Sequence, residues 1–297
     1  MPVESLTTMF EQARRGKYAL GYFEAWDPYS LEAVLAAAEA EDAPVILGFG
    51  GMMVDRAWLN AGGVALLGAL GRSVAARAKV PVALLLNEVP TIEHAYMGMD
   101  AGFNAVMVDT SSWETQRAIP AIAALTRDAH KRGVAVEAEL GRLPDAVGDG
   151  IDDSSAALTD PAQAAYFVEQ TGVDCLAVSI GNVHLLTNGY APVDMAHLEA
   201  IHQRVAVPLV IHGGTSFPPD QVPRAIAAGG LKFNVGTILK AVFLQGVRET
   251  VQQLPAASGS RPNVHDLMGS HKETDLMRVG QARMIAKVRE LIRLYRG

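Results

Sequence analysis

Short, mainly apolar runs alternate with helix-forming stretches along most of the chain. We expect strands at 19–23, 44–47, 80–86, 104–108, 134–139, 175–179, 209–211 and 231–235. Each run has the length of a buried strand in a parallel sheet, and the stretch that follows it is long enough for a crossover helix. Eight consecutive strand–helix units predict a TIM (β/α)8 barrel, with a doubly wound open sheet as the alternative.

The intervening stretches predict the helices and the domain organisation. Helices are expected at 5–15, at 30–39 with Ser30 as its N-cap, at 64–78, at 91–101 with Thr91 as its N-cap, at 113–132 with an interruption at Pro120, from 159 onward with Pro161 in its first turn, at 195–204 and at 221–229. No composition shift marks a domain boundary. We therefore predict a single barrel domain, 1–297, with a C-terminal helical extension from about 239.

The end of that extension has an amphipathic pattern. Between 277 and 295 the apolar residues Met284, Ile285, Val288, Leu291 and Ile292 follow a helical stripe. This stripe is expected to pack against the barrel or against a second subunit.

Composition limits the class of protein. The 297 residues are 49% hydrophobic with a formal net charge of -7, which argues against nucleic acid as the main partner. The single cysteine, Cys175, lies in an apolar run and is expected in the core, as in a reducing cytoplasm. The N-terminus does not resemble a signal peptide, and no apolar run has the length of a membrane span. These features predict a cytoplasmic protein with a small-molecule substrate.

Polar residues stand at the carboxyl ends of nearly all the predicted strands. They are Glu24, Asn87, Glu88, Asp109, Glu139, His184, His212 and Asn234. Because barrel enzymes build their active sites from the carboxyl ends of the strands, these side chains are expected to converge on one rim.

Two of the polar residues are histidines. Of eight histidines in the chain, only His184 and His212 fall at strand ends. A single histidine in such a place is more often a hydrogen-bonded core residue than a ligand. Together with Glu88, however, the pair makes a set of two imidazoles and one carboxylate, which is able to hold a divalent metal. The metal prediction depends on the barrel, since the sequence spacings are long.

Two loops that follow the last two predicted strands are rich in glycine. His212 is followed by Gly213, Gly214 and Thr215, and Asn234 is followed by Val-Gly236-Thr237. Glycine lets the backbone turn sharply and approach a ligand closely, and consecutive backbone N–H groups can form an anion cradle. Between 141 and 157 lies a Gly/Asp-rich segment with almost no apolar periodicity, which we expect to be a mobile active-site loop.

Several longer runs resemble the class II, metal-dependent ketose-bisphosphate aldolases, the fructose- and tagatose-bisphosphate aldolases. The similar runs are Gly-Tyr-Phe at 21–23, Glu-Ala-Glu-Leu-Gly-Arg at 137–142, Leu-Thr-Asp-Pro at 158–161, Ala-Val-Ser-Ile-Gly-Asn-Val-His at 177–184, Val-Ile-His-Gly-Gly-Thr at 210–215 and Lys-Phe-Asn-Val-Gly-Thr at 232–237. The resemblance covers nearly the whole barrel. The Glu-Ala-Glu-Leu-Gly-Arg run and the Val-Ile-His-Gly-Gly-Thr run together are specific for this family, because the two are not expected together in this order by chance.

The resemblance implies roles for particular residues. His184 and His212 match two of the three catalytic zinc ligands, while Asp109 and Glu139 match carboxylates that can hold the metal in an alternative position. The phosphate-binding positions are matched by Gly181, Gly213, Gly214, Thr215, Asn234, Gly236 and Thr237. A homodimer or homotetramer is implied as well.

The sequence departs from the family at the catalytic centre. Where the family has Asp-His-Gly, with the catalytic acid and the third ligand, this chain has Asn87-Glu88-Val89. Glu88 can replace the histidine, but an oxygen ligand shifts preference from Zn towards Mn, Mg, Co or Fe.

Other departures alter the charge around the site. Glu24 replaces a family asparagine. The Glu-Asp pair of the family's mobile loop becomes Gly148-Asp149, with Asp145 nearby. A family lysine shortly after the third ligand is absent between His184 and Tyr190, which weakens the case for a phosphate because a backbone cradle would lack its point charge.

Three functions are compatible with these residues. The first is a metal-dependent class II aldolase-type C–C lyase acting on a keto sugar, sugar acid or sugar phosphate through a metal-stabilised enediolate. Glu24, Asp145 or Asp149 would accept the hydroxyl proton, and Asn87 would hydrogen-bond a substrate hydroxyl. The second is an epimerase or isomerase on the same scaffold, using the extra carboxylates as acid/base groups. The third is a catalytically retired binding or assembly protein.

Overall fold

The core of the protein is a closed barrel of parallel strands. The computed structural model describes residues 3–52, 54–147, 150–152, 156–186, 189–254 and 263–297. The barrel strands are β1 (Leu20–Ala25), β2 (Val45–Gly50), β3 (Val82–Val89), β4 (Ala105–Val108), β5 (Ala135–Leu140), β8 (Cys175–Val178), β9 (Leu209–Ile211) and β10 (Gly230–Val235). Their order around the barrel is β1-β10-β9-β8-β5-β4-β3-β2. This closure confirms the (β/α)8 prediction and rules out the open sheet.

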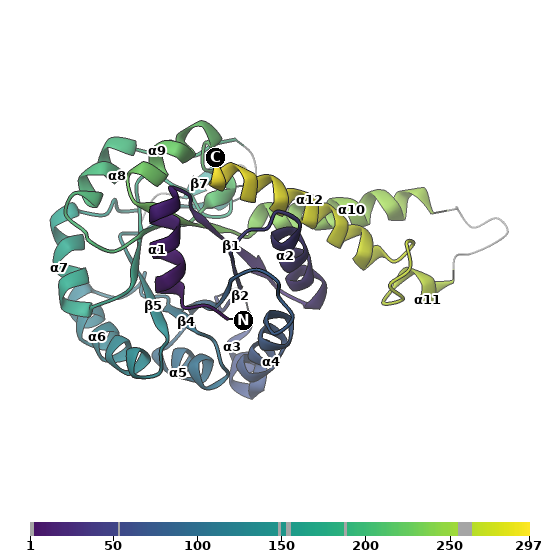
Figure 1. The fold of residues 1–297 in the computed structure, drawn as a ribbon, viewed down its shortest axis with the longest axis horizontal. Helices are drawn as coiled ribbons and strands as arrows, with labels where there is room; N and C mark the ends of the chain where they lie inside the picture. Colours follow the sequence, from purple (N-terminus) through teal and green to yellow (C-terminus); the bar gives the residue numbers. More distant parts are fainter. Residues whose placement is uncertain (1–2, 53, 148–149, 153–155, 187–188, 255–262) are drawn as a thin grey trace.

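Helices surround the barrel, cross one of its ends and project from one side of it (Figure 1). They are α1 (Leu6–Gly16), α2 (Pro28–Ala40), α3 (Arg56–Trp58), α4 (Val64–Ala75), α5 (Ile92–Asp100), α6 (Thr115–Lys131), α7 (Pro161–Thr171), α8 (Met195–His202), α9 (Val222–Ala227), α10 (Thr237–Gln253), α11 (Val264–Leu267) and α12 (Leu276–Arg296), with a π-helical turn at Leu59–Gly63 and 3-10 turns at Gly214–Ser216 and Pro219–Gln221. Thr91 caps α5 as predicted, since its side chain accepts a hydrogen bond from the backbone N–H of His94.

Two helix predictions were wrong in detail. Ser30 is not the N-cap of α2: the helix begins at Pro28 with Asp27 as its cap, and Ser30 completes a reciprocal capping box. Helix α6 is not interrupted at Pro120 but runs through it. The proline removes one hydrogen bond, to the carbonyl of Gln116, and that residue is exposed, so water can replace the missing donor.

The segment 141–157 is more ordered at its base than predicted. It contains an antiparallel pair, β6 (Asp145–Val147) and β7 (Gly150–Asp152). Arg142 pairs with Ala157 through two backbone hydrogen bonds of 2.9 Å, which tie the two ends of the segment together. The predicted active-site loop thus contains a short hairpin. Its mobility stays a prediction, and Asp149 lies outside the described residues.

Helix α1 covers the amino-terminal end of the barrel and lies across the centre of the ring in Figure 1. Its apolar side chains Leu6, Met9 and Phe10 are buried in a cluster with inward-facing barrel residues such as Leu20 and Leu231. Burial of these side chains closes the lower end of the barrel, so the site must be sought at the carboxyl ends of the strands.

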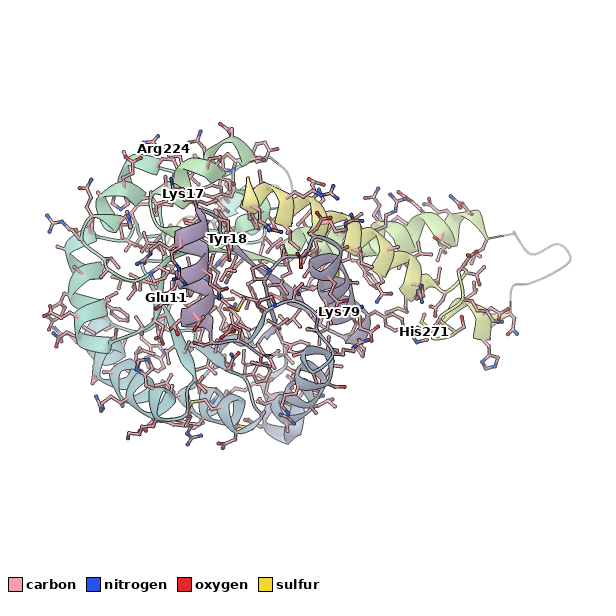
Figure 2. All side chains as sticks on the ribbon, in the orientation of Figure 1. Glu11, Lys17, Tyr18, Lys79, Arg224 and His271 are labelled. Atoms are coloured by element: carbon pink, nitrogen blue, oxygen red, sulfur yellow. The ribbon has the colours of Figure 1, made fainter. Side chains whose placement is uncertain are left out.

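Helices α10 and α12 extend beyond the barrel on one side, where α12 packs on both α10 and α2 (Figure 1). Met284, Val288 and Ile292 of the predicted stripe are buried, which confirms the contact with this chain's own helices. Near its end, α12 places Tyr295 against Phe233, with ring centroids 4.6 Å apart. His271 lies on this projecting side of the molecule (Figure 2), with its ring stacked on Tyr29.

Within the part of the chain that the structure describes, none of the helices has the length and apolarity needed to cross a membrane.

Candidate active site at the carboxyl ends of the barrel strands

A pocket of about 380 Å³ opens at the carboxyl ends of the barrel strands. It is lined by thirteen of the predicted site residues: Glu24, Asn87, Glu88, Asp109, Glu139, Asp145, His184, His212, Gly213, Thr215, Asn234, Gly236 and Thr237. Gly181 and Gly214 are not among its lining residues. The convergence that the barrel implied is thus present, and it includes residues from seven of the eight strand ends.

Four side chains in the pocket form a cluster with the donor types of a metal site. One ligand atom from each of Glu88, Glu139, His184 and His212 lies within 4.8 Å of the other three. The carboxylate oxygen Oε2 of Glu139 is buried and makes no hydrogen bond within the described residues, although Nδ1 of His212 lies 3.3 Å away. A buried oxygen without a partner is costly, so a cation would satisfy it. The cluster therefore fits the divalent metal that the sequence predicted.

His212, at the end of β9, is held by carboxylates on both sides of its ring. Its Nε2 lies 3.0 Å from Oε1 of Glu137, while its Nδ1 lies 3.3 Å from carboxylate oxygens of both Glu88 and Glu139. With Nε2 donating to Glu137, the Nδ1 lone pair would face the cluster. Glu137 therefore selects the ring nitrogen that can bind a metal.

Glu137 is itself fixed by a buried ion pair. Its Oε2 accepts a hydrogen bond of 2.6 Å from Nζ of Lys232, and neither side chain is exposed. The same Nζ donates to Asn234 Oδ1 at 2.6 Å. No role was predicted for Glu137 or Lys232. The available signal was a pair of opposite charges within two barrel strands, Glu137 two residues before Glu139 in β5 and Lys232 two residues before Asn234 in β10.

Glu88 reaches the cluster through an unusual backbone conformation. Its φ is 49°, in the left-handed region that non-glycine residues seldom occupy, and the register of β3 against β4 shifts between Leu86 and Val89. The neighbouring Asn87 donates from Nδ2 to Glu88 Oε2 at 2.6 Å. Asn87 thus orients the carboxylate. Asn87 lines the pocket, and its buried Oδ1 makes no hydrogen bond within the described residues.

The two carboxylates of the cluster have opposite pKa shifts. Burial would raise the pKa of Glu88, but the adjacent His212 charge and hydrogen bond lower it to about 2. Burial raises the pKa of Glu139 to about 7, reinforced by the charges of Glu88 and Asp109 and opposed by His212. Burial would lower the pKa of His212, yet Glu88 and Glu137 raise it to about 10. Without a metal, the excess negative charge is thus balanced by protons.

His184 is held by the hairpin rather than by a strand. Its backbone N–H donates to Pro144 O and its carbonyl accepts from Ala146 N, both at 2.9 Å. Its Nδ1 lies 3.5 Å from Oδ1 of Asp145, and its ring centroid is 5.8 Å from that of His212. Burial lowers the pKa of His184, and the charge of Glu88 partly opposes this shift. The lowered pKa favours the neutral imidazole, which is the form that binds metals.

Asp109 lines the pocket but does not belong to the four-residue cluster. Its Oδ1 accepts a hydrogen bond of 2.9 Å from the backbone N–H of Ser111, which holds the carboxylate towards the loop after β4. Its predicted role as an alternative metal ligand stays a prediction.

The glycine-rich loops meet at the other side of the pocket. Gly213 has φ 67°, and a Cβ there would lie 2.3 Å from the carbonyl oxygen of Val183, so only glycine fits. Helix α10 begins at Thr237, and its N-cap residue Gly236 has no side chain with which to cap it. Thr215 Oγ1 accepts a hydrogen bond of 3.3 Å from the backbone N–H of Ile238 in the first turn. Because Gly236 and Thr237 line the pocket, the positive dipole end of the helix lies at the pocket, as in an anion site. Asn234 Nδ2, buried nearby, has no partner among the described residues.

Two cations line this pocket that were not predicted as site residues. Lys240, in the first turn of α10, donates from Nζ to Glu24 Oε1 at 2.6 Å, and Arg142 lies after β5. The sequence comparison had noted only a missing lysine after His184. The signal for Lys240 was its position, one helical turn beyond the Gly236-Thr237 loop.

Comparisons with known proteins agree with this geometry. A family model described as "Fructose-bisphosphate aldolase class-II" matches residues 4–297. The fructose-bisphosphate aldolase of Geobacillus stearothermophilus is 35% identical over 272 residues, covering 90% of this chain and 89% of that protein. That of Staphylococcus epidermidis is 32% identical over 256 residues, covering 84% and 87%.

A solved structure supports the same assignment. The crystal structure of the YdjI aldolase from Escherichia coli K12 superposes with a TM-score of 0.79 at 27% identity, covering 99% of this chain and 97% of that one. The barrel, the cluster of metal-ligand side chains and the full-length family match all agree, and the chain belongs to the class II fructose-bisphosphate aldolase family, the metal-dependent C–C lyases.

Proposed function

We propose that this lyase cleaves a phosphorylated keto sugar by a retro-aldol reaction, with its metal held by Glu88, His184 and His212. The observation that carries the proposal is the position of the four-residue cluster beside the anion-binding end of α10, within one pocket. The names of the relatives supply the substrate class, since they act on a ketose bisphosphate by name.

The metal site would offer two imidazole nitrogens and one or two carboxylate oxygens. When bound, a divalent metal there supplies Lewis-acid polarisation of a substrate carbonyl oxygen. Two imidazoles suit Zn, Mn, Co or Fe better than Mg, which prefers oxygen donors. The extra carboxylate of Glu139, at 3.3 Å from His212 Nδ1, supports a site with more oxygen character than a three-histidine zinc site.

Proton transfer falls to a carboxylate at the rim of the pocket. Glu24 is held by Lys240, whereas Asp145 is more than half exposed on the hairpin and lies beside His184. These positions favour Asp145 as the group that accepts the hydroxyl proton, while Asp149 stays a prediction from the family resemblance. Asn87, unable to exchange a proton near neutral pH, would accept a hydrogen bond from a substrate hydroxyl at its free Oδ1.

The test combines metal content with product analysis. We expect close to one equivalent of divalent metal after purification without chelator, and two shorter fragments from a ketose phosphate. Asp145→Asn should keep the metal and lose a factor of about 10²–10⁴ in kcat. An isomer of unchanged mass would replace the lyase with the epimerase, and failure to bind metal even on titration would refute both. The comparisons give no support to the epimerase or the retired protein over the lyase.

Assembly and location complete the proposal. A homodimer or homotetramer is supported by the family resemblance, and light scattering on the purified protein would measure it. A cytoplasmic location is consistent with the single buried cysteine and the family's metabolic role.

A further inference from the structure

We propose that Glu24 and Lys240 together set how strongly the pocket holds an anionic substrate group. In this proposal Lys240 is the cation that contacts the group, and Glu24 is an internal anion that competes for Lys240. The inference rests on the proposed function for the location of the substrate, but it concerns residues that the family comparison does not assign. It makes this pair the determinant of phosphate affinity.

The carboxylate of Glu24 lies at the predicted anion site itself. A Cβ built on Gly236 would lie 3.2 Å from Glu24 Oε2, and one built on Gly50 would lie 2.9 Å from the same atom. The side chain therefore fills the space that these two glycines leave open. Gly236 is the residue just before α10, so a negative charge already stands at the positive end of that helix.

Lys240 is positioned for both possible partners. It donates to Glu24 Oε1 at 2.6 Å, and its side chain remains about one-third exposed. Its Nζ lies 5.9 Å from the ring centroid of Trp26, and the side chain lines the pocket. Because Lys240 is the fourth residue of α10, its backbone N–H bonds to Gly236 O, so loop and side chain move as one unit.

A separate observation indicates that this end of the pocket is built to receive an acceptor group. Asn234, only 8% exposed, lines the pocket, and its Nδ2 is a buried donor without a partner in the described chain. Its Oδ1 is already used by Lys232 Nζ, which fixes the amide so that Nδ2 must point elsewhere. Thr215 adds a hydroxyl whose oxygen accepts from Ile238 N at 3.3 Å. A phosphate or carboxylate oxygen would satisfy the free amide N–H.

Charge repulsion and attraction determine how the Glu24–Lys240 pair affects phosphate binding. A phosphate at the start of α10 would bring up to two negative charges close to the Glu24 carboxylate. Like charges in close proximity repel strongly in a partly desolvated site. Binding becomes favourable when Lys240 turns from the carboxylate to the phosphate, a charge-assisted contact of comparable strength. The ion pair thus weakens phosphate binding without abolishing it, and a neutral group at this position gains nothing from Lys240.

A double-mutant cycle on the metal-loaded protein tests the competition. Inorganic phosphate is titrated by calorimetry into the wild type, Glu24→Gln, Lys240→Met and the double variant, with metal content and melting temperature measured in parallel. We expect Glu24→Gln to bind phosphate about tenfold more tightly and Lys240→Met about tenfold more weakly. In the double variant the gain from Glu24→Gln should largely disappear, because there is no lysine to release.

The outcomes separate this inference from the lyase assignment. Unchanged or weaker binding by Glu24→Gln, or unchanged binding by Lys240→Met, would overturn the inference, and an equal gain in both backgrounds would overturn the competition for Lys240. Glu290→Gln and Lys287→Met are matched controls, because they alter a surface ion pair on α12 and should leave phosphate affinity unchanged. Fragment formation from a ketose phosphate is measured independently, so the lyase can stand if the pair proves irrelevant.

Discussion

Glu137 does not line the pocket, yet it determines how His212 can act. Its carboxylate accepts a hydrogen bond from Nε2 of His212 at 3.0 Å and is itself held by Lys232 at 2.6 Å. Such an outer partner fixes the tautomer and the ring orientation of a metal-binding histidine. The geometry of the metal site therefore depends on a buried charge pair inside the barrel.

Glu137→Gln is expected to reduce metal affinity by about 10- to 100-fold, because the neutral amide holds the imidazole less firmly. Competition with a chromophoric chelator measures the affinity. Glu290→Gln, on the surface of α12, serves as the control for loss of one carboxylate. Unchanged metal affinity in a folded Glu137→Gln protein would contradict this role. A variant with both Glu137→Gln and Lys232→Met removes the pair without leaving a buried charge unpaired and shows whether any loss comes from unfolding.

The stability of the metal-free protein should fall between pH 6.5 and pH 9. Glu139 has its pKa raised from 4.5 to about 7, and His212 from 6.5 to about 10. Both groups bind their proton more tightly when folded, so their contribution is greatest at low pH and is lost as the pH rises through those values. Glu88, with a pKa lowered to about 2, contributes above pH 4.5 and stays constant across this window.

Urea unfolding of chelator-treated protein at the two pH values checks this expectation. Glu139→Gln should flatten the lower part of the profile, near pH 7. Metal affinity should rise over the same window, because the metal competes with those protons. A free energy of unfolding that is constant or higher at pH 9 would contradict the assigned shifts.

The sequence predicted which residues lie in the site better than it predicted which of them contact one another. Glu88, Glu139, His184 and His212 were predicted from strand ends and family resemblance, and they do converge. The contacts of Glu137 with Lys232 and of Glu24 with Lys240 join residues 95 and 216 positions apart. Such pairs depend on register around the barrel, which a single sequence does not specify.

At the scale of elements, the turn after β9 controls the position of His212. Gly213 has φ 67° and lies against the carbonyl of Val183, and Asn182 Nδ2 donates to His212 O at 2.9 Å. This hydrogen bond joins the loops after β8 and β9, so strain at Gly213 would reach both His184 and His212.

Gly213→Ala should destabilise the protein by more than Gly133→Ala. Gly133 also has a left-handed φ, 69°, but open space surrounds its Cβ position. The control variant should therefore lose only about 1–2 kcal/mol of backbone strain, whereas Gly213→Ala adds a backbone clash. Thermal unfolding and metal content measure the difference. Equal losses with full metal loading in both variants would contradict this account.

Element boundaries were predicted best where local chemistry decides them. Thr91 caps α5 as expected, but Asp27 outcompetes Ser30 for the start of α2, because the capping box needs both residues at a spacing of three. The hairpin in 141–157 has no apolar alternation to reveal it. Its first strand, β6, is held instead by the backbone contacts of His184 with Pro144 and Ala146, which are tertiary.

At the scale of the molecule, the C-terminal helix is part of the core. Val288 is fully buried between α12 and its neighbours, whereas Leu244 on α10 is 61% exposed. Val288→Ala should lower the free energy of unfolding by about 1–3 kcal/mol, and Leu244→Ala should be nearly neutral. Urea unfolding checks both. A larger loss for Leu244 would indicate that this face is buried in an assembly.

The barrel itself was predictable from strand–helix periodicity, since a large parallel sheet with covered faces has few closed solutions. The position of α1 beneath the barrel was not predicted, and for α12 the sequence left open whether its apolar stripe packs on the barrel or on a second subunit. Each helix packs its apolar face on a barrel or helix surface that is still exposed. That surface exists only once the barrel has formed, so the sequence of the helix alone does not identify it.

The seam between β1 and β10 has a consequence for the order of folding. Ala19 N–H donates to Tyr295 O at 2.9 Å, and the Tyr295 ring stacks on Phe233 and lies beside Phe23. Strand β1 pairs with β2, its neighbour in the sequence, on one side, but its other edge is covered only by β10, far along the chain. Until β10 and α12 are in place, that edge of β1 is unpaired, and an unpaired strand edge is a template for aggregation during folding.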